Sequence, residues 1–133
     1  MRFTYTAPLL LIALIGTLLT GCVSAGHAAP RPARINHVVF IKLVDPADAP
    51  ALIADCDATI RAMPMVRSYW AGTHIDTGRA SVDADYHVGA YMGFDSTEDY
   101  AAYVIDPRHV DLVARWRDRM QWLRVYDVFD ETP

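Results

Sequence analysis

The side chains best suited to chemistry in this sequence are two histidines and a tyrosine. Tyr103 lies six residues before His109, and His37 belongs to an apolar segment early in the chain. A phenol can hold a carbonyl oxygen by a hydrogen bond while an imidazole removes the neighbouring α-proton. We therefore expect Tyr103 as the donor, His109 as the base of an enolisation or aldol-type cyclisation, and His37 as the residue that orients the ring or the substrate.

Each of these residues also has a structural explanation. His37 could be a core histidine with a polar partner, because buried polar groups are normally hydrogen-bonded. Tyr103 could pack its ring and donate to a backbone carbonyl. His109 could simply start a helix, since Asp106 suits the N-cap and Pro107 the first helical position.

The charge state of His109 is left open by the sequence. The positive end of a helix dipole disfavours an imidazolium in the first turn. The Asp106 carboxylate at the cap favours one. The two influences act in opposite directions, so the direction of the pKa shift is not predicted.

No metal or cofactor is expected. Four histidines could approach one cleft: His37, His74, His87 and His109. No pair of them has the spacing of a zinc site. The sequence also has no glycine-rich phosphate loop and no ligand set for haem or flavin.

The elements that would position these residues can be assigned from apolar periodicity. Segments with alternating polarity and many β-branched or aromatic residues are expected strands: 35–44, 66–75, 86–94 and 122–129. Segments with apolar residues at helical spacing are expected helices: 45–63, a short one from Asp95 with Glu98 at capping-box spacing, and one from Asp106 to about Met120. This order predicts an α+β, ferredoxin-like fold, with a four-stranded antiparallel sheet and helices on one face. The other face would be bare and apolar, which favours a second subunit packed on it.

The first 34 residues differ from the rest. Residues 1–21 have one positive charge and then an uncharged apolar run, the layout of a secretory signal. Their ending, "LLTGC", resembles the lipobox of bacterial lipoproteins, which implies cleavage before Cys22 and a lipid on that cysteine. The alternative is an ordinary signal cut after "VSA" at residues 23–25, which would remove Cys22. Residues 22–34 would then be a lipidated cysteine and a flexible tether, ahead of a domain at 35–130.

The cellular location and the expected binding partners follow from these features. A lipid anchor implies the cell envelope and a membrane partner. Val23 stands where an aspartate would mark retention in the inner membrane, so the periplasmic side of the outer membrane is preferred. The net charge is −4, and removal of Arg2 with the signal makes it one unit more negative. This charge gives no basic excess for nucleic acid.

Cys56 would be the only free thiol of a lipidated chain. It lies between Asp55 and Asp57, whose charges raise a thiol pKa. We expect a buried helix residue and not a nucleophile.

Several segments together resemble the stress-responsive A/B barrel (Dabb) family of the dimeric α+β barrel superfamily. They are "NHVVFIKL" from Asn36, "YWAG" from Tyr69, "YMGFDSTEDYAAYVIDPRHVDLV" from Tyr91 and "VYDV" from Val125. The resemblance implies a homodimer whose two sheets close a barrel. It also implies a cleft between each sheet and its own helices.

The resemblance leaves two functions open. Some members are polyketide cyclases, and their acid/base residues fall on His109 and Tyr103, with a strand-one histidine at His37. The cyclases carry a second histidine where this chain has Asp106. The preferred interpretation is a membrane-anchored, homodimeric protein of unassigned reaction that binds a small apolar ligand. The alternative is an acid/base enzyme similar to these cyclases or to the cofactor-free monooxygenases of the superfamily.

Overall fold

The computed structural model describes residues 31–132, so the predicted signal and Cys22 lie outside the described residues. Four strands and three helices follow one another along the chain: β1 (Ile35–Leu43), α1 (Ala49–Ile60), β2 (Ser68–Thr73), β3 (Val88–Phe94), α2 (Thr97–Ile105), α3 (Pro107–Trp116) and β4 (Met120–Phe129). Short 3-10 turns precede α1 (Pro46–Asp48) and β4 (Arg117–Arg119).

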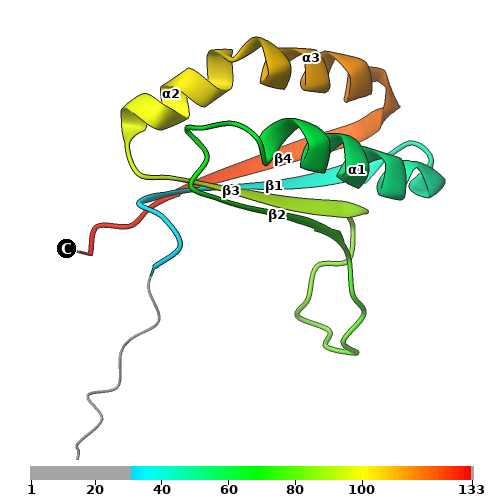
Figure 1. The fold of residues 1–133 in the computed structure, drawn as a ribbon. Coiled ribbons are helices and arrows are strands. Elements are labelled where there is room, and N and C mark those ends of the chain that lie inside the picture. Colours follow the sequence, from blue (N-terminus) through cyan, green and yellow to red (C-terminus); the bar gives the residue numbers. More distant parts are fainter. Residues whose placement is uncertain (1–30, 133) are drawn as a thin grey trace, which may run out of the picture.

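The strands form one sheet in the order β2-β3-β1-β4, and every neighbouring pair is antiparallel. All three helices lie on the same side of this sheet (Figure 1). The predicted α+β ferredoxin-like fold is therefore confirmed.

Strand β1 shows why the core lies under the helices. Its odd-numbered residues from Ile35 to Leu43 are buried and its even-numbered residues are half-buried, as alternation in a strand requires. Four of the five buried side chains are aliphatic, and the fifth is His37. The helix-facing side of the sheet thus places one polar ring in an otherwise apolar row.

The helices begin where short polar side chains can cap them. The N-cap of α2 is Ser96, whose hydroxyl accepts from the Asp99 amide, and not Asp95 as predicted. Asp95 instead pairs with Arg67. The N-cap of α3 is Asp106, which accepts from the Arg108 amide, as predicted.

Most element boundaries differ from the sequence prediction by a few residues, and two of the differences have a clear structural cause. Helix α3 ends at Trp116 and not near Met120, because a 3-10 turn follows and β4 already begins at Met120. The last residues of the predicted tether pack against the fold. Ala33 is buried, and the Arg34 amide donates to the Phe94 carbonyl at 3.1 Å.

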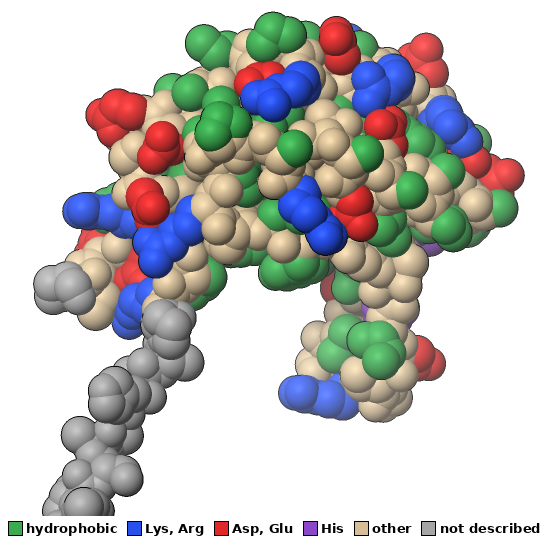
Figure 2. All heavy atoms as spheres, in the orientation of Figure 1, with side chains coloured by type: hydrophobic (Ala, Val, Ile, Leu, Met, Phe, Trp, Pro, Cys, Tyr) green, Lys and Arg blue, Asp and Glu red, His purple; other side chains and the backbone are tan. Residues whose placement is uncertain are grey.

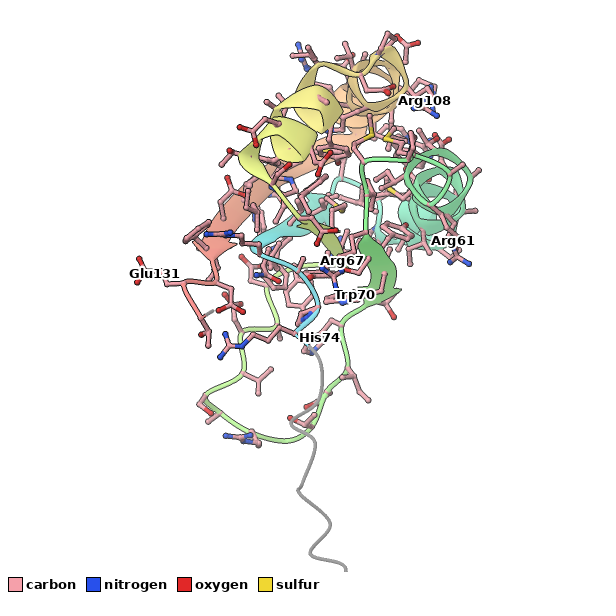
Figure 3. All side chains as sticks on the ribbon, turned by 60° about the vertical axis from the view of Figure 1, so that its left-hand side comes forward. Arg61, Arg67, Trp70, His74, Arg108 and Glu131 are labelled. Carbon is pink, nitrogen blue, oxygen red and sulfur yellow. The ribbon has the colours of Figure 1, made fainter. Side chains whose placement is uncertain are left out.

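The sheet face opposite the helices carries several aromatic side chains. We call this surface the bare sheet face and define it by Val38, Phe40, Trp70, Tyr91 and Tyr126. The Trp70 ring stacks on Tyr91 with 5.7 Å between ring centroids and remains 52% exposed. Figure 3 shows Trp70 on β2, with His74 where the β2–β3 loop leaves the sheet.

The outer surface is charged but mixed in sign. On the face seen in Figure 2, basic and acidic side chains lie close together, without a large area of either sign. Some of them form ion pairs, such as Arg115 with Asp55. No helix within residues 31–132 combines the length and apolar character needed to span a membrane.

Candidate functional site

A cleft of about 310 Å³ lies between the sheet and the helices. Most of its lining is apolar and comes from all three helices and from β1, β3 and β4. Its polar lining groups are two histidines and two tyrosines: His37, Tyr100, Tyr103 and His109. A mostly apolar pocket with a few converging polar groups is the usual form of a small-molecule site.

His37 is held by an acid on the neighbouring strand. The β1–β4 register places Asp127 directly opposite His37, and its Oδ1 lies 2.6 Å from His37 Nδ1. The Tyr100 hydroxyl donates to the other carboxylate oxygen at 2.9 Å. His37 Nδ1–H is therefore the donor to Asp127, and Nε2 has no partner among the residues that the structure describes. His37 is only 7% exposed.

Tyr103 lies close to both histidines of the cleft. Its ring centroid lies 4.2 Å from that of His109 and 5.9 Å from that of His37, and the residue is 1% exposed. Its hydroxyl makes no hydrogen bond within the described part of the chain, which differs from the structural alternative of a bond to a backbone carbonyl. Burial is the main cause that raises the pKa of Tyr103, so the side chain is a neutral phenol that can donate.

His109 is fixed by the turn between α2 and α3. Its Nδ1–H donates to the Val104 carbonyl at 3.2 Å, so Nε2 carries the lone pair of the neutral ring. The pKa of His109 is lowered from 6.5, chiefly by burial and further by the nearby His37. The hydrogen bond to Val104 and the Asp106 charge oppose this shift but do not reverse it. The direction of the His109 pKa shift, which the sequence left open, is thus downward, and the ring is neutral near pH 7.

Asp106 is engaged on the outer side of the same turn. Both of its oxygens accept from the Arg108 guanidinium, at 2.9 and 2.7 Å. These bonds, with the one from the Arg108 amide, lower the pKa of Asp106 to about 2. The Arg108 guanidinium therefore compensates much of the Asp106 charge that would otherwise act on the cleft.

The structure brings together all three residues selected from the sequence. It also adds two that sequence reasoning missed, Asp127 and Tyr100. Asp127 continues the inward-facing row of Leu123 and Val125 on β4, and an acid in an apolar alternating row was a usable signal. Tyr100 precedes Tyr103 by three residues, which places both on one face of α2.

The other residues considered for chemistry have different roles. His87 Nδ1 accepts from the Leu43 amide at 3.0 Å, and the His74 ring packs against Tyr86. Residues 31–132 contain no group of three or more His, Cys, Asp or Glu side chains placed to hold a metal. Cys56 is buried in the cleft wall. Its pKa is raised to about 12 by burial first and then by its two acidic neighbours, in agreement with the predicted inert thiol.

Comparison with protein families identifies the domain. The family described as Stress responsive A/B Barrel Domain matches residues 35–130. The chain belongs to this family. The comparison with curated proteins finds no match.

Solved structures similar to this A/B barrel protein include a Dabb family protein from Mesorhizobium loti. It is 22% identical, with 74% of this chain and 97% of that chain covered and a TM-score of 0.62. A hydroxynitrile lyase from Passiflora edulis is 16% identical, with 77% and 99% covered and a TM-score of 0.64. A dimeric ferredoxin-like protein of unknown function from Thermobifida fusca is 19% identical, with 72% and 90% covered and a TM-score of 0.60. At these identities the likeness concerns the fold, and three of the similar ferredoxin-like proteins are described as dimeric.

Proposed function

We propose that this A/B barrel protein is an acid/base catalyst that acts on a small, largely apolar molecule bound in the cleft. The observation that carries the proposal is the His37–Asp127 pair. One nitrogen of a cleft-lining imidazole is held by a carboxylate, and the other is left without a partner among the described residues. A carboxylate so placed fixes the tautomer and stabilises the imidazolium that forms when the ring takes a proton.

The step assigned to this site is removal of a proton next to a carbonyl group. The α-carbon proton passes to His37 Nε2, and the electron pair of the C–H bond delocalises onto the carbonyl oxygen as an enolate. The Tyr103 hydroxyl donates to that oxygen. The imidazolium then exchanges its proton with solvent, and transfer of the solvent-derived proton to the carbon completes an exchange cycle. His37 replaces His109 as the proposed base because Asp127 stabilises its charged form. The neutral His109 offers Nε2 as an acceptor for a substrate hydroxyl.

The fold is compatible with such a role, since a hydroxynitrile lyase is among the proteins that share it. That relative's reaction is not assigned to this chain, because fold alone does not determine function. Ligand binding without turnover, the preferred interpretation of the sequence, is the alternative that the experiment must separate.

Proton exchange into solvent tests the proposal without knowledge of the natural substrate. A panel of apolar ketones and aldehydes is incubated in D₂O with the protein, and loss of the α-proton signal is followed by NMR. We expect exchange with the wild type and its loss in His37→Gln and Tyr103→Phe. His74→Gln, the same type of change outside the cleft, should retain it. Saturable binding without exchange for every compound would favour a binding protein instead.

The same proposal includes a homodimer formed through the bare sheet face. The exposed aromatic rings of this face and the dimeric relatives support it. A stable homodimer usually buries about 1,200 Å² or more. Light scattering of the domain without its tether should report a dimer at micromolar concentration, and a monomer would refute this part.

Membrane anchoring through Cys22 completes the proposal. It is supported by the "LTGC" ending of the signal-like segment, and the outer membrane remains the preferred location. More than one acyl chain is needed for firm anchoring, so extraction should require detergent. Mass spectrometry should find a mature chain that begins with lipidated Cys22. A chain that begins at Gly26, or a Cys22→Ser variant that stays on the membrane, would contradict anchoring.

A further inference from the structure

We infer that the cleft selects neutral molecules and rejects anions, with the carbonyl group of the ligand placed between His37 and Tyr103. This inference rests on the proposed function, because it takes the cleft to be the substrate site. It adds the chemical class of the substrate, namely an uncharged aldehyde, ketone or similar compound with an apolar body.

The first support is the absence of a cationic side chain in the lining. Among the residues that the structure describes, none that lines the cleft is a lysine or an arginine. The arginines nearest in sequence to His109 and His37 are engaged elsewhere: Arg108 pairs with Asp106, and the Arg34 guanidinium lies over the Phe129 ring. Figure 3 shows Arg108 and Arg61 at the outer surface of the helical layer. A bound carboxylate or phosphate would therefore find no arginine or lysine in the cleft.

The second support is the charge of the groups that do line the cleft. Burial keeps Tyr103 and Cys56 protonated and keeps His109 neutral. Within residues 31–132, the carboxylate in contact with the polar end is that of Asp127, through His37 and Tyr100. When His37 is protonated, Asp127 already balances it, so an incoming anion meets no net positive charge.

These conditions penalise an anion twice. It loses its hydration in an apolar pocket without gaining a countercharge, and it also approaches the Asp127 carboxylate. A carbonyl group loses much less on transfer and gains the Tyr103 hydrogen bond. We therefore expect the neutral member of a matched pair to bind at least about tenfold more tightly, a difference that one unpaired buried charge readily exceeds.

The apolar part of the cleft fixes the direction in which such a molecule lies. His37 is near the start of β1, whereas Ile41 and Leu43, near its end, face Leu123 and Met120 of β4. Leu112 and Trp116 of α3 contribute further apolar lining. With the carbonyl at His37 and Tyr103, the hydrocarbon body extends along β1 toward Met120.

Phenylacetone and phenylacetate form a matched pair for the test, because they differ in a methyl group against a charged oxygen. Binding of each to the dimeric protein is measured by NMR titration at pH 7.5, and exchange of the phenylacetone α-protons is followed in parallel. We expect phenylacetone to bind at least about tenfold more tightly than phenylacetate. Asp127→Asn should reduce this ratio. Val125→Lys, which adds an ammonium group to the cleft wall at a residue 43% exposed, should shift it toward phenylacetate. Ile105→Lys adds the same charge on α2 outside the lining and should leave the ratio unchanged.

The results separate the two proposals. Equal or tighter binding of phenylacetate would overturn the inference, and so would failure of both compounds to bind. Exchange of another carbonyl compound would in either case still support the proposed function. Selective binding of phenylacetone without exchange of any compound would support the inference and remove the proposed catalytic role.

Discussion

Tyr100 and Tyr103 lie on one face of α2, and the same Tyr→Phe substitution at each position distinguishes a structural hydroxyl from a functional one. The Tyr100 hydroxyl donates to the Asp127 carboxylate at 2.9 Å, whereas the Tyr103 hydroxyl has no partner among the described residues. A hydrogen bond to a charged group contributes about 1.5–3 kcal/mol, and exposure of Asp127 places this one near the lower limit. Tyr100→Phe should therefore lower the free energy of unfolding by about 1–1.5 kcal/mol. Tyr103→Phe should change it by less than about 0.5 kcal/mol, because no bond within the protein is lost.

Thermal melting at a fixed protein concentration measures this difference. In a domain of about 100 residues, 1 kcal/mol corresponds to about 4–8 °C in melting temperature. Tyr100→Phe should melt lower by about this amount, and Tyr103→Phe should melt close to the wild type. In the exchange assay the order reverses, since Tyr103→Phe should lose most activity although its stability is intact. A Tyr103→Phe variant destabilised by more than about 1 kcal/mol would show that its hydroxyl has a structural role and would refute this reasoning.

Three further predictions concern other parts of the molecule. The pKa of His109 is lowered in the fold, so the unfolded chain binds the proton first as pH falls. The free energy of unfolding should therefore decline below pH 6.5, and His109→Gln should flatten part of that decline in melting experiments. Gly93→Ala should cost about 1–3 kcal/mol in denaturant unfolding, since a Cβ there would overlap Ser68 Oγ, while Gly72→Ala has open space and should cost little. Tyr126→Lys, on the bare sheet face, should convert the dimer to a monomer in light scattering without loss of the helical signal in circular dichroism.

The elements could be predicted from sequence because their signals are local. The alternation in β1 and the Asp106–Pro107 start of α3 each depend on a few neighbouring residues, and both are confirmed. The prediction of Asp95 as the cap of α2 was wrong, because Ser96 caps the helix and Asp95 pairs with Arg67. That pairing joins residues far apart in sequence.

The candidate site was predictable only in part for the same reason. His37, Tyr103 and His109 could be selected by residue type and by resemblance, and all three line the cleft. The partner of His37 could not be identified from the sequence, because Asp127 lies 90 positions away and is placed by strand register. The direction of the His109 pKa shift likewise required knowledge of its burial, which outweighs the Asp106 charge.

The α-proton exchange rate of Asp127→Asn, relative to wild type, tests the acid/base site most directly. The substitution keeps the size of the side chain and removes the charge that stabilises protonated His37. Positioned general bases contribute about 10²–10⁴ in rate, so we predict a fall of at least about 100-fold in exchange while phenylacetone still binds. An Asp127→Asn protein that exchanges protons at the wild-type rate would contradict the proposed role of the His37–Asp127 pair.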